Sequence, residues 1–274
     1  MTAHVSDDFG SGDGVRSGDA PDGLVLLDVS GGVGTVTLNR PRQLNALNQA
    51  AADQLVQVVS HVASREDIQV VLLTAAGRSF CAGGDVFEMA EAADPSAVLA
   101  DLVGSVNAAV AALTELDKPI VAAVQGAVAG AGIGVMLTAD VIIAADDARF
   151  AAGYAKVGLS PDGGTATMVP AAIGLQRALD FYLNARTIGA LLALEWGMIT
   201  EIVDAGELAR AAEDRAQLFA AGAASALGQT RRLLRAAVNR ELASGFGDEA
   251  ATIVRQAGTR YAMEAISAFA SRVR

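Results

Sequence analysis

Two short glycine-rich stretches stand out as places where the backbone itself could do chemistry. The first covers residues 79–86 and the second covers residues 125–134. Each follows an apolar run typical of a buried strand and leads into a segment with helical periodicity. The first turn of a helix carries unpaired N–H groups and the positive end of the helix dipole. Two such turns can aim two N–H groups at one point, which is the geometry that holds an oxyanion.

Side chains that could move a proton or attack a substrate are few. Asp162 lies in a Pro-Asp-Gly-Gly sequence, where an aspartate is by itself expected to cap the helix that follows. The single cysteine, Cys81, has no histidine near it in sequence and is expected to be small apolar filler of the core. The two histidines, His4 and His61, are poorly placed for a Ser-His-Asp triad. No Cys/His cluster suggests a metal site.

Composition narrows the class of protein. The chain has 274 residues, and 52% of them are hydrophobic, which is ample for a large core. A net charge of -11 argues against nucleic acid as a main partner. The longest uncharged apolar stretch, residues 120–139, is interrupted by glycines, so we expect a strand and a short helix there and no membrane span.

The N-terminal residues 1–22 are rich in Gly, Asp and Ser. They lack the basic start and the apolar core of a signal peptide, so we expect a disordered tail. One cysteine excludes an internal disulfide, and a cytoplasmic location is the expectation.

Hydrophobic periodicity predicts an α/β core over residues 23–205 and a helical region over residues 206–274. The predicted strands cover residues 24–29, 33–38, 70–74, 120–124, 141–144 and 199–203. Helices are predicted after Asn48, Asp94 and Gly130, and over residues 167–173, 175–183 and 189–196. Asn48 is a typical N-cap, and Pro95 is a typical first-turn proline. In the C-terminal region, Gly222, Gly228 and residues 245–247 are expected to break the helices.

Three motifs, in order and at a characteristic spacing, resemble those of the crotonase superfamily, also called the enoyl-CoA hydratase/isomerase family. They cover residues 39–47 (NRPRQLNAL), 79–85 (SFCAGGD) and 125–134 (QGAVAGAGIG). The resemblance runs from about residue 24 to residue 272 and implies a coil of β-β-α units with a helical C-terminal region. Members bind acyl-CoA thioesters and stabilise a thioester enolate with two backbone N–H groups. Coenzyme A would belong to the substrate, and no separate cofactor is implied.

By position, the resemblance assigns the two oxyanion donors to Gly84 and Ala131. The family usually has glycine at the second position, and alanine keeps the N–H group. Each donor of this kind contributes roughly 3 kcal/mol to transition-state stabilisation. The resemblance also implies a path for coenzyme A, with Arg42, Leu44 and Ala46 near the nucleotide end and Ala82, Asp85 and Val86 along the adenine and pantetheine. Arginine suits a phosphate, although a surface role for Arg42 remains open.

The departures from the family pattern concern the acid–base groups. Family hydratases use two glutamates, and this chain has Gly134 and Tyr154 at the matching positions. Hydration needs one group to activate water and another to deliver a proton, so hydratase activity is disfavoured. Gly134 and Tyr154 would then line the substrate site. The resemblance to family isomerases implies that Asp162 shuttles a proton between two carbons of the acyl chain, with helix capping as its alternative.

An acyl-CoA isomerase is therefore the leading hypothesis, and an apolar pocket of Val86, Val128 and Leu159 would raise the pKa of Asp162. A hydratase-like lyase and a catalytically degenerate acyl-CoA binder stay open as alternatives. Dehalogenation is disfavoured, because it would need a histidine base near the acyl group, and the only histidines are His4 and His61. Residues 130–134 only loosely match a dinucleotide turn, because the third glycine and an acidic partner are missing.

The family's C-terminal region builds trimers, usually paired into hexamers. We therefore expect a homotrimer or hexamer, since the apolar faces of the helical tail would otherwise be exposed. By the same resemblance, Phe269 and Arg272 would approach the coenzyme A of a neighbouring subunit.

Overall fold

The computed structural model describes the backbone of residues 23–222, 224–258 and 260–273. The predicted N-terminal tail, residues 1–22, lies outside the described residues. The main sheet has the strand order β1-β2-β3-β4-β6-β9. Its strands are β1 (Val25–Ser30), β2 (Val33–Leu38), β3 (Val70–Ala75), β4 (Ile120–Val124), β6 (Val141–Ala145) and β9 (Glu201–Val203). The β1–β2 pair is antiparallel, and every other neighbouring pair in this sheet is parallel.

A second sheet has the order β5-β7-β8, with β5 (Ala127–Ala129), β7 (Arg149–Ala151) and β8 (Thr187–Gly189). Strand β5 follows β4 directly, and β7 follows β6, so each of these turns of the chain contributes one strand to each sheet. This arrangement is the coil of β-β-α units that the family resemblance implies, and the predicted fold class is confirmed.

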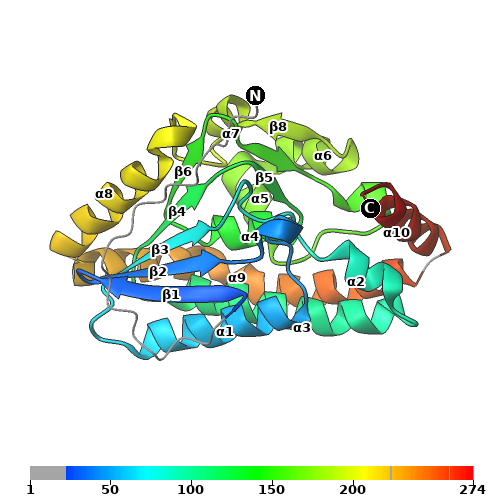
Figure 1. Ribbon diagram of the computed structural model, residues 1–274, viewed down its shortest axis with the longest axis horizontal. Helices are drawn as coiled ribbons and strands as arrows, with labels where there is room; N and C mark the ends of the chain where they lie inside the picture. The colour runs from blue at the N-terminus through cyan, green and yellow to red at the C-terminus, as the bar shows by residue number, and fades with distance from the viewer. Residues whose placement is uncertain (1–22, 223, 259, 274) are drawn as a thin grey trace, which may run out of the picture.

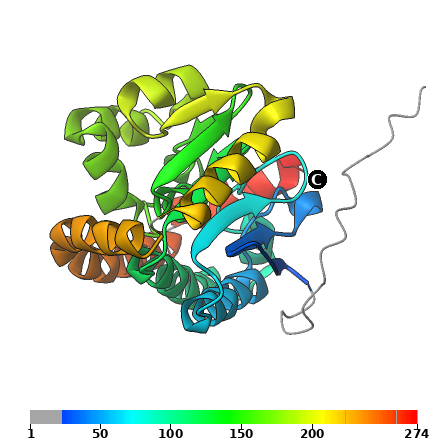
Figure 2. The ribbon, with the colours of Figure 1, turned by 90° about the vertical axis from the view of Figure 1, so that its left-hand side faces the viewer.

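Helices cover both faces of the main sheet. On one face lie α1 (Gln49–Ser64) and α3 (Pro95–Glu115), and on the other lies α8 (Leu208–Ala221), as Figures 1 and 2 show. The side chains of β3, β4 and β6 alternate between these two layers because successive residues of a strand point to opposite faces. The helical region predicted to start at residue 206 thus supplies part of the main core.

The structure has further helices besides α1, α3 and α8. They are α2 (Val86–Glu91), α4 (Ala131–Leu137), α5 (Thr165–Ile173), α6 (Leu175–Leu183), α7 (Ala190–Trp196), α9 (Ala224–Ala257) and α10 (Arg260–Val273), with short 3-10 turns η1 (Pro41–Gln43), η2 (Tyr154–Val157) and η3 (Ala205–Glu207). Helix α9 runs along α3. Helix α10 packs on α2 and η2 of its own chain (Figure 1).

Most of the helix caps and helix ends that the sequence predicts are present in the structure. The Asn48 side chain accepts the Ala51 N–H at 3.0 Å and caps α1, and Pro95 opens α3. Helix α3 is long and apolar enough, by length and composition, to cross a membrane, and in this fold its buried face packs in the core. Gly222 ends α8 as predicted.

The predicted breaks at Gly228 and residues 245–247 are wrong, because α9 continues through all of them. A β-carbon at Gly228 would lie 1.8 Å from the carbonyl oxygen of Asp117. Glycine at this position therefore allows α9 to cross the segment before β4 closely, without ending the helix.

The buried side chain of Arg231 connects α9 to the core through hydrogen bonds. The guanidinium of Arg231 donates to Asp140 Oδ2 at 2.8 Å and to backbone carbonyls at the ends of α3 and α4. The last carbonyls of a helix have no partner within the helix, so a cation there satisfies them and complements the dipole.

Candidate active site

The first glycine-rich loop is joined to the preceding motif by a short parallel ladder. Three backbone hydrogen bonds make it: Ala82 N–H to the Leu44 oxygen (3.0 Å), Leu47 N–H to the Gly83 oxygen (2.7 Å) and Asp85 N–H to the Leu47 oxygen (2.9 Å). Leu47 bonds to the residues on either side of Gly84, and Gly84 lies opposite Leu47 in the ladder. In a parallel ladder, the N–H of a residue in that position points away from the neighbouring segment. The N–H of Gly84 accordingly donates to no residue that the structure describes, and it is available to a ligand.

The second glycine-rich loop ends at the start of α4. Ala131 is the first residue of this helix, and its N–H, a first-turn donor, has no acceptor among the described residues. The preceding residue, Gly130, has φ +52°, a left-handed conformation that suits glycine. Both predicted oxyanion donors therefore have uncommitted N–H groups.

The two loops lie against each other. Cys81 N–H donates to the Ala127 oxygen at 3.2 Å, and Ala129 N–H donates to the Cys81 oxygen at 2.9 Å. A β-carbon at Gly83 would lie 2.9 Å from the Ala129 oxygen and 3.4 Å from the α-carbon of Gly130. Only glycine at position 83 allows the loops to approach this closely, and the contact brings the donor-bearing segments together.

Asn45 organises the first loop, a role that the sequence analysis missed. Its side chain is 2% exposed, and its backbone has φ +54°. The amide Nδ2 donates to the carbonyls of Ala76 and Ser79 at 2.8 and 2.7 Å, and Oδ1 accepts the Arg40 N–H at 2.7 Å. An asparagine tolerates the left-handed conformation and supplies both donors and acceptors, which identifies a loop-fixing residue within the first motif.

Arg40 was also missed, and it accounts for the burial of Asp85. Arg40 Nη2 pairs with Asp85 Oδ2 at 2.9 Å, and Arg40 Nη1 donates to the carbonyl of Ala46. The other carboxylate oxygen of Asp85 accepts the Phe87 N–H at 3.2 Å and caps α2. A buried ion pair with a cap therefore fixes the point where the first loop turns into α2.

The predicted coenzyme A path falls on this same ladder. Leu44, Ala46, Ala82 and Asp85 lie along its two neighbouring segments, as the hydrogen bonds above require. Val86 is the first residue of α2, and it is half-buried together with Leu44, Ala46 and Ala82. Arg42 is exposed on η1. The substrate-binding roles of these residues remain predictions.

Asp162 lies in the loop between η2 and α5. The N-cap of α5 is Gly164, two residues further on, so Asp162 does not occupy the N-cap position. Its backbone oxygen accepts the Thr165 hydroxyl at 2.7 Å and the Thr165 N–H at 3.1 Å. Its carboxylate Oδ1 accepts the hydroxyl of Tyr154 at 2.6 Å. Asp162 is 6% exposed and Tyr154 is 8% exposed, so this hydrogen bond is shielded from bulk water.

Burial is the main influence on both groups. Desolvation raises the pKa of Asp162 to about 6, and the hydrogen bond from Tyr154 opposes part of that rise. Burial, together with the nearby charge of Asp162, raises the pKa of Tyr154 well above its ordinary value, so the phenol stays protonated and donates. A carboxyl group that titrates near neutrality can both take a proton and return it.

The position of the first missing glutamate is filled by the Asp162 loop. A β-carbon at Gly134 would lie 2.0 Å from the carbonyl oxygen of Gly163. A β-carbon at Gly163 would in turn lie 3.2 Å from the Ala131 β-carbon. The loop that carries Asp162 therefore packs against the N-terminus of α4, next to Ala131, the second predicted oxyanion donor. It also leaves no space for a side chain at position 134.

Cys81 is buried as expected, and burial raises the pKa of its thiol to about 11. A thiol that stays protonated at neutral pH is a poor nucleophile. The candidate reactive groups at this site are therefore the two backbone N–H groups and the Asp162–Tyr154 pair.

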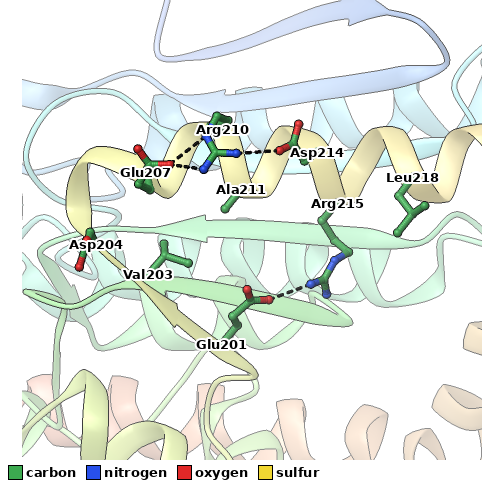
Figure 3. A pocket seen from close by; sticks show the side chains of 9 residues that line it. All are labelled: Glu201, Val203, Asp204, Glu207, Arg210, Ala211, Asp214, Arg215 and Leu218. Carbon is green, nitrogen blue, oxygen red and sulfur yellow. Dashed lines mark hydrogen bonds and ion pairs between the residues drawn. The ribbon is translucent and has the colours of Figure 1, made fainter.

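A cleft of about 520 Å³ lies elsewhere, between α8 and β9 (Figure 3). Its two arginines are already paired with acidic side chains: Arg210 with Glu207 and Asp214, and Arg215 with Glu201. None of the residues that line the cleft belongs to the glycine-rich loops, and its arginines are held in ion pairs, so it offers no evident catalytic group.

A family profile described as enoyl-CoA hydratase/isomerase matches residues 28–273. The chain therefore belongs to this family, the crotonase superfamily. The 1,2-epoxyphenylacetyl-CoA isomerase of Escherichia coli (strain K12) is 38% identical over 218 residues, which are 78% of this chain and 82% of that protein. The trans-2-decenoyl-[acyl-carrier-protein] isomerase of Streptococcus mutans is 34% identical, with 67% of this chain and 71% of that protein covered.

Other relatives carry a different activity in their names. A probable enoyl-CoA hydratase of Rhodobacter capsulatus is 32% identical, with 82% of this chain and 86% of that protein covered. Among solved structures, an enoyl-CoA hydratase from Mycobacterium avium subsp. paratuberculosis K-10 superposes with a TM-score of 0.84 at 29% identity, covering 90% of this chain and 99% of that one. The family thus spans isomerases and hydratases, and the residues of the site must decide between them.

Proposed function

We propose that this protein is an acyl-CoA thioester isomerase that shifts a double bond or carries out a related rearrangement through an enolate. The observation that carries the proposal is Asp162, a buried carboxyl group with no cationic partner among the described residues, on a loop that packs against the second predicted oxyanion donor. The N–H groups of Gly84 and Ala131 would hold the thioester oxygen as negative charge develops on it.

The proposed reaction balances with one base. Asp162 removes a proton from the α-carbon of a 3-enoyl thioester, and the electron pair of that C–H bond flows into the carbonyl to form a dienolate. The protonated Asp162 then returns the proton to the γ-carbon, which leaves the double bond between the α- and β-carbons. A pKa of about 6 suits both halves of this transfer near neutral pH.

The same site is poorly equipped for hydration. Water addition needs a base for the water and an acid for the α-carbon. Position 134 has no side chain and is covered by Gly163, while position 154 carries a phenol that is engaged with Asp162. The two relatives named isomerases, at 38% and 34% identity, support the same direction.

The substrate class is an acyl-CoA thioester, with coenzyme A as part of the substrate. The relative from Escherichia coli is named for an epoxide-bearing acyl-CoA, so a ring-opened or oxygenated acyl group is the second candidate beside a simple 3-enoyl chain. Both reactions require a stabilised enolate and one mobile proton.

The test compares two activities of the unmodified protein. One assay follows conversion of a 3-enoyl-CoA to the conjugated 2-enoyl-CoA, and the other follows hydration of crotonyl-CoA. Isomerisation is expected to exceed hydration by about 10²-fold or more, because a missing general acid or base typically lowers a rate by that factor. Hydration at a comparable rate would contradict the proposal, and tight acyl-CoA binding without turnover would favour the degenerate-binder alternative.

We also propose that the protein assembles as a homotrimer or as a hexamer of two trimers. Helix α6 exposes Leu175, Leu179 and Leu183 at spacings of four, and α7 exposes Leu191. Such a row of leucines is unfavourable in water and suits an interface between copies. Light scattering at micromolar concentration should give three or six chains, and a monomer would contradict this assembly.

The position of α10 bears on the residues expected to reach a neighbouring subunit. The helix lies against α2 and η2 of its own chain, and Phe269 on it is 38% exposed. The side chain of Arg272 lies outside the described residues. A contact between Phe269 and the coenzyme A of a neighbouring copy remains a proposal.

A further inference from the structure

Tyr154 touches the Asp162 carboxylate on one oxygen only. Its hydroxyl lies 2.6 Å from Oδ1 and 3.3 Å from the Asp162 backbone oxygen. Within the part of the chain that the structure describes, Oδ2 accepts no hydrogen bond from another residue. One carboxylate oxygen is thus held and the other is left for a ligand.

We propose that Tyr154 is the positioning residue of the reaction: by holding Oδ1 it orients the carboxylate so that Oδ2 exchanges the proton with the acyl chain. The inference rests on the proposed function, in which Asp162 is the base. It reassigns Tyr154, whose position in the sequence predicts contact with substrate, to a role that acts through Asp162.

Both partners of this hydrogen bond are fixed from outside the pair. The backbone carbonyl oxygen of Tyr154 accepts the Leu159 N–H at 3.0 Å, which closes the turn after η2 and fixes the backbone that carries the phenol. On the other side, Thr165 holds the backbone oxygen of Asp162 with its hydroxyl and its N–H. A hydrogen bond between two anchored groups sets the direction of the carboxylate more firmly than one between mobile side chains.

The phenol also lies beside the second oxyanion loop. A β-carbon at Gly130 would lie 3.7 Å from the Tyr154 hydroxyl oxygen, and Gly130 directly precedes the donor residue Ala131. The tyrosine therefore bridges the loop that holds negative charge and the carboxylate that moves the proton. A larger residue at position 130 would separate the two.

Among the described side chains, few titratable groups lie on the elements around this carboxylate. Helix α4 carries no titratable side chain, and α6 contributes Tyr182, whose ring centroid is 6.2 Å from that of Tyr154. The charged residues of η2 and α6 are turned elsewhere: Lys156 is exposed, Arg177 lies over the Trp196 ring and Asp180 pairs with Arg186. The charged residues of α9 and α10 with described ion pairs have partners away from Asp162: Arg231 and Arg235 pair with Asp140, and Arg260 pairs with Glu264.

Replacing Tyr154 with phenylalanine tests the proposal, because it removes one oxygen and keeps the ring. Loss of the donor favours the protonated carboxyl group, so the acidic limb of the pH profile of kcat should move to higher pH. At optimal pH, kcat should fall about 10- to 100-fold through misorientation, with KM nearly unchanged. A purely structural role would lower the amount of folded enzyme without moving the pH profile.

Tyr182→Phe is the matched control, because it removes a hydroxyl from the neighbouring ring, and the described hydrogen bonds include none from that hydroxyl to the Asp162 carboxylate. It should keep the wild-type pH profile. If Tyr154→Phe also keeps the wild-type kcat and pH profile while Asp162→Asn is inactive, this inference fails and the proposed function stands. If Asp162→Asn retains activity, the proposed function itself fails.

A second variant covers poor folding of Tyr154→Phe. Fluorotyrosine incorporated at position 154 is a stronger hydrogen-bond donor, so the acidic limb should move in the opposite direction, to lower pH. An unmoved limb, or a limb that moves to higher pH, would overturn the proposal.

Discussion

The two glycine-rich loops present backbone groups to the site, whereas residues 154–165 present side chains. The N–H groups of Gly84 and Ala131 are set by a ladder, a helix start and the close contact of Gly83 with Gly130. In residues 154–165, the position of the Asp162 carboxylate depends on the hydrogen bond that it accepts from Tyr154. An oxyanion hole made of backbone tolerates changes of side chain, but an acid–base group does not.

This difference offers a physical account of how one fold serves several reactions. Relatives named as isomerases and as hydratases both resemble this chain over most of its length. The backbone donors serve any reaction that passes through a thioester enolate. The acid–base side chains determine how many proton transfers the site can catalyse. Among the described residues, Asp162 is a buried carboxyl group without a cationic partner, whereas the buried Asp85 is paired with Arg40.

For the glycine-rich loops, the largest effect on kcat is expected from Gly84→Pro, which removes one proposed oxyanion donor. Loss of a single donor typically lowers kcat by about 10²- to 10³-fold. Gly84→Ala is the matched control, since it keeps the N–H, and its β-carbon would meet the end of the flexible Met89 side chain at 2.9 Å and Leu102 Cδ2 at an ordinary 3.7 Å. Steady-state kinetics on folded variants should separate the two, and equal activities would remove Gly84 from the oxyanion hole.

In residues 154–165, the buried Asp162 should make the free energy of unfolding depend on pH. The pKa of Asp162 is about 6 in the fold against an ordinary 3.8, so ionising it opposes folding. Its contribution to stability is fully present below pH 3.8 and is lost as the pH rises through about 6. The difference corresponds to about 3 kcal/mol at 1.36 kcal/mol per pKa unit.

Asp162→Asn carries no charge and should therefore be more stable than wild type at pH 8, with the advantage vanishing near pH 4. Denaturant unfolding at several pH values measures this. Parallel stability curves for the two proteins would show that the carboxylate is not held in a desolvated state.

The smallest effect, a change in stability, is expected at Gly134, where the second glycine-rich loop contacts the loop that carries Asp162. Gly134→Ala places a β-carbon 2.0 Å from the Gly163 oxygen, so the loop with Asp162 must shift. Overpacking of this kind typically destabilises by about 1–3 kcal/mol. Gly104→Ala on α3, where nothing lies within 4 Å, is the control and should be neutral or stabilising by up to about 1 kcal/mol. Equal melting temperatures would contradict the tight packing at Gly134.

The sequence predicted those parts of the fold whose signals are local. The bounds of β4 and α6, and the cap at Asn48, follow from apolar runs and a capping residue within a few positions. The three-residue strands β5, β7 and β8 are too short to show a periodicity. Gly228 suggested a helix break because its reason, the contact with Asp117, is distant in the sequence.

The site shows the same division. The family motifs predicted roles for Gly84, Ala131 and Asp162, but they did not indicate which neighbouring residues position these three. Asn45 and Arg40 act through carbonyls and a carboxylate up to 45 residues away, and no local pattern encodes such partners. The signal that could have found Asn45 is an asparagine between apolar residues in the first motif, because a buried amide must satisfy both ends.

The most direct test of the central claim is the kinetics of Asp162→Asn on a 3-enoyl-CoA, with binding of an unreactive CoA thioester measured in parallel. Asparagine keeps the size of the side chain and can still accept the Tyr154 hydroxyl, but it cannot take up the α-proton. The account predicts a fall in kcat of at least about 10²-fold with thioester binding retained. Near wild-type isomerisation by this variant would contradict it and leave Asp162 a structural residue.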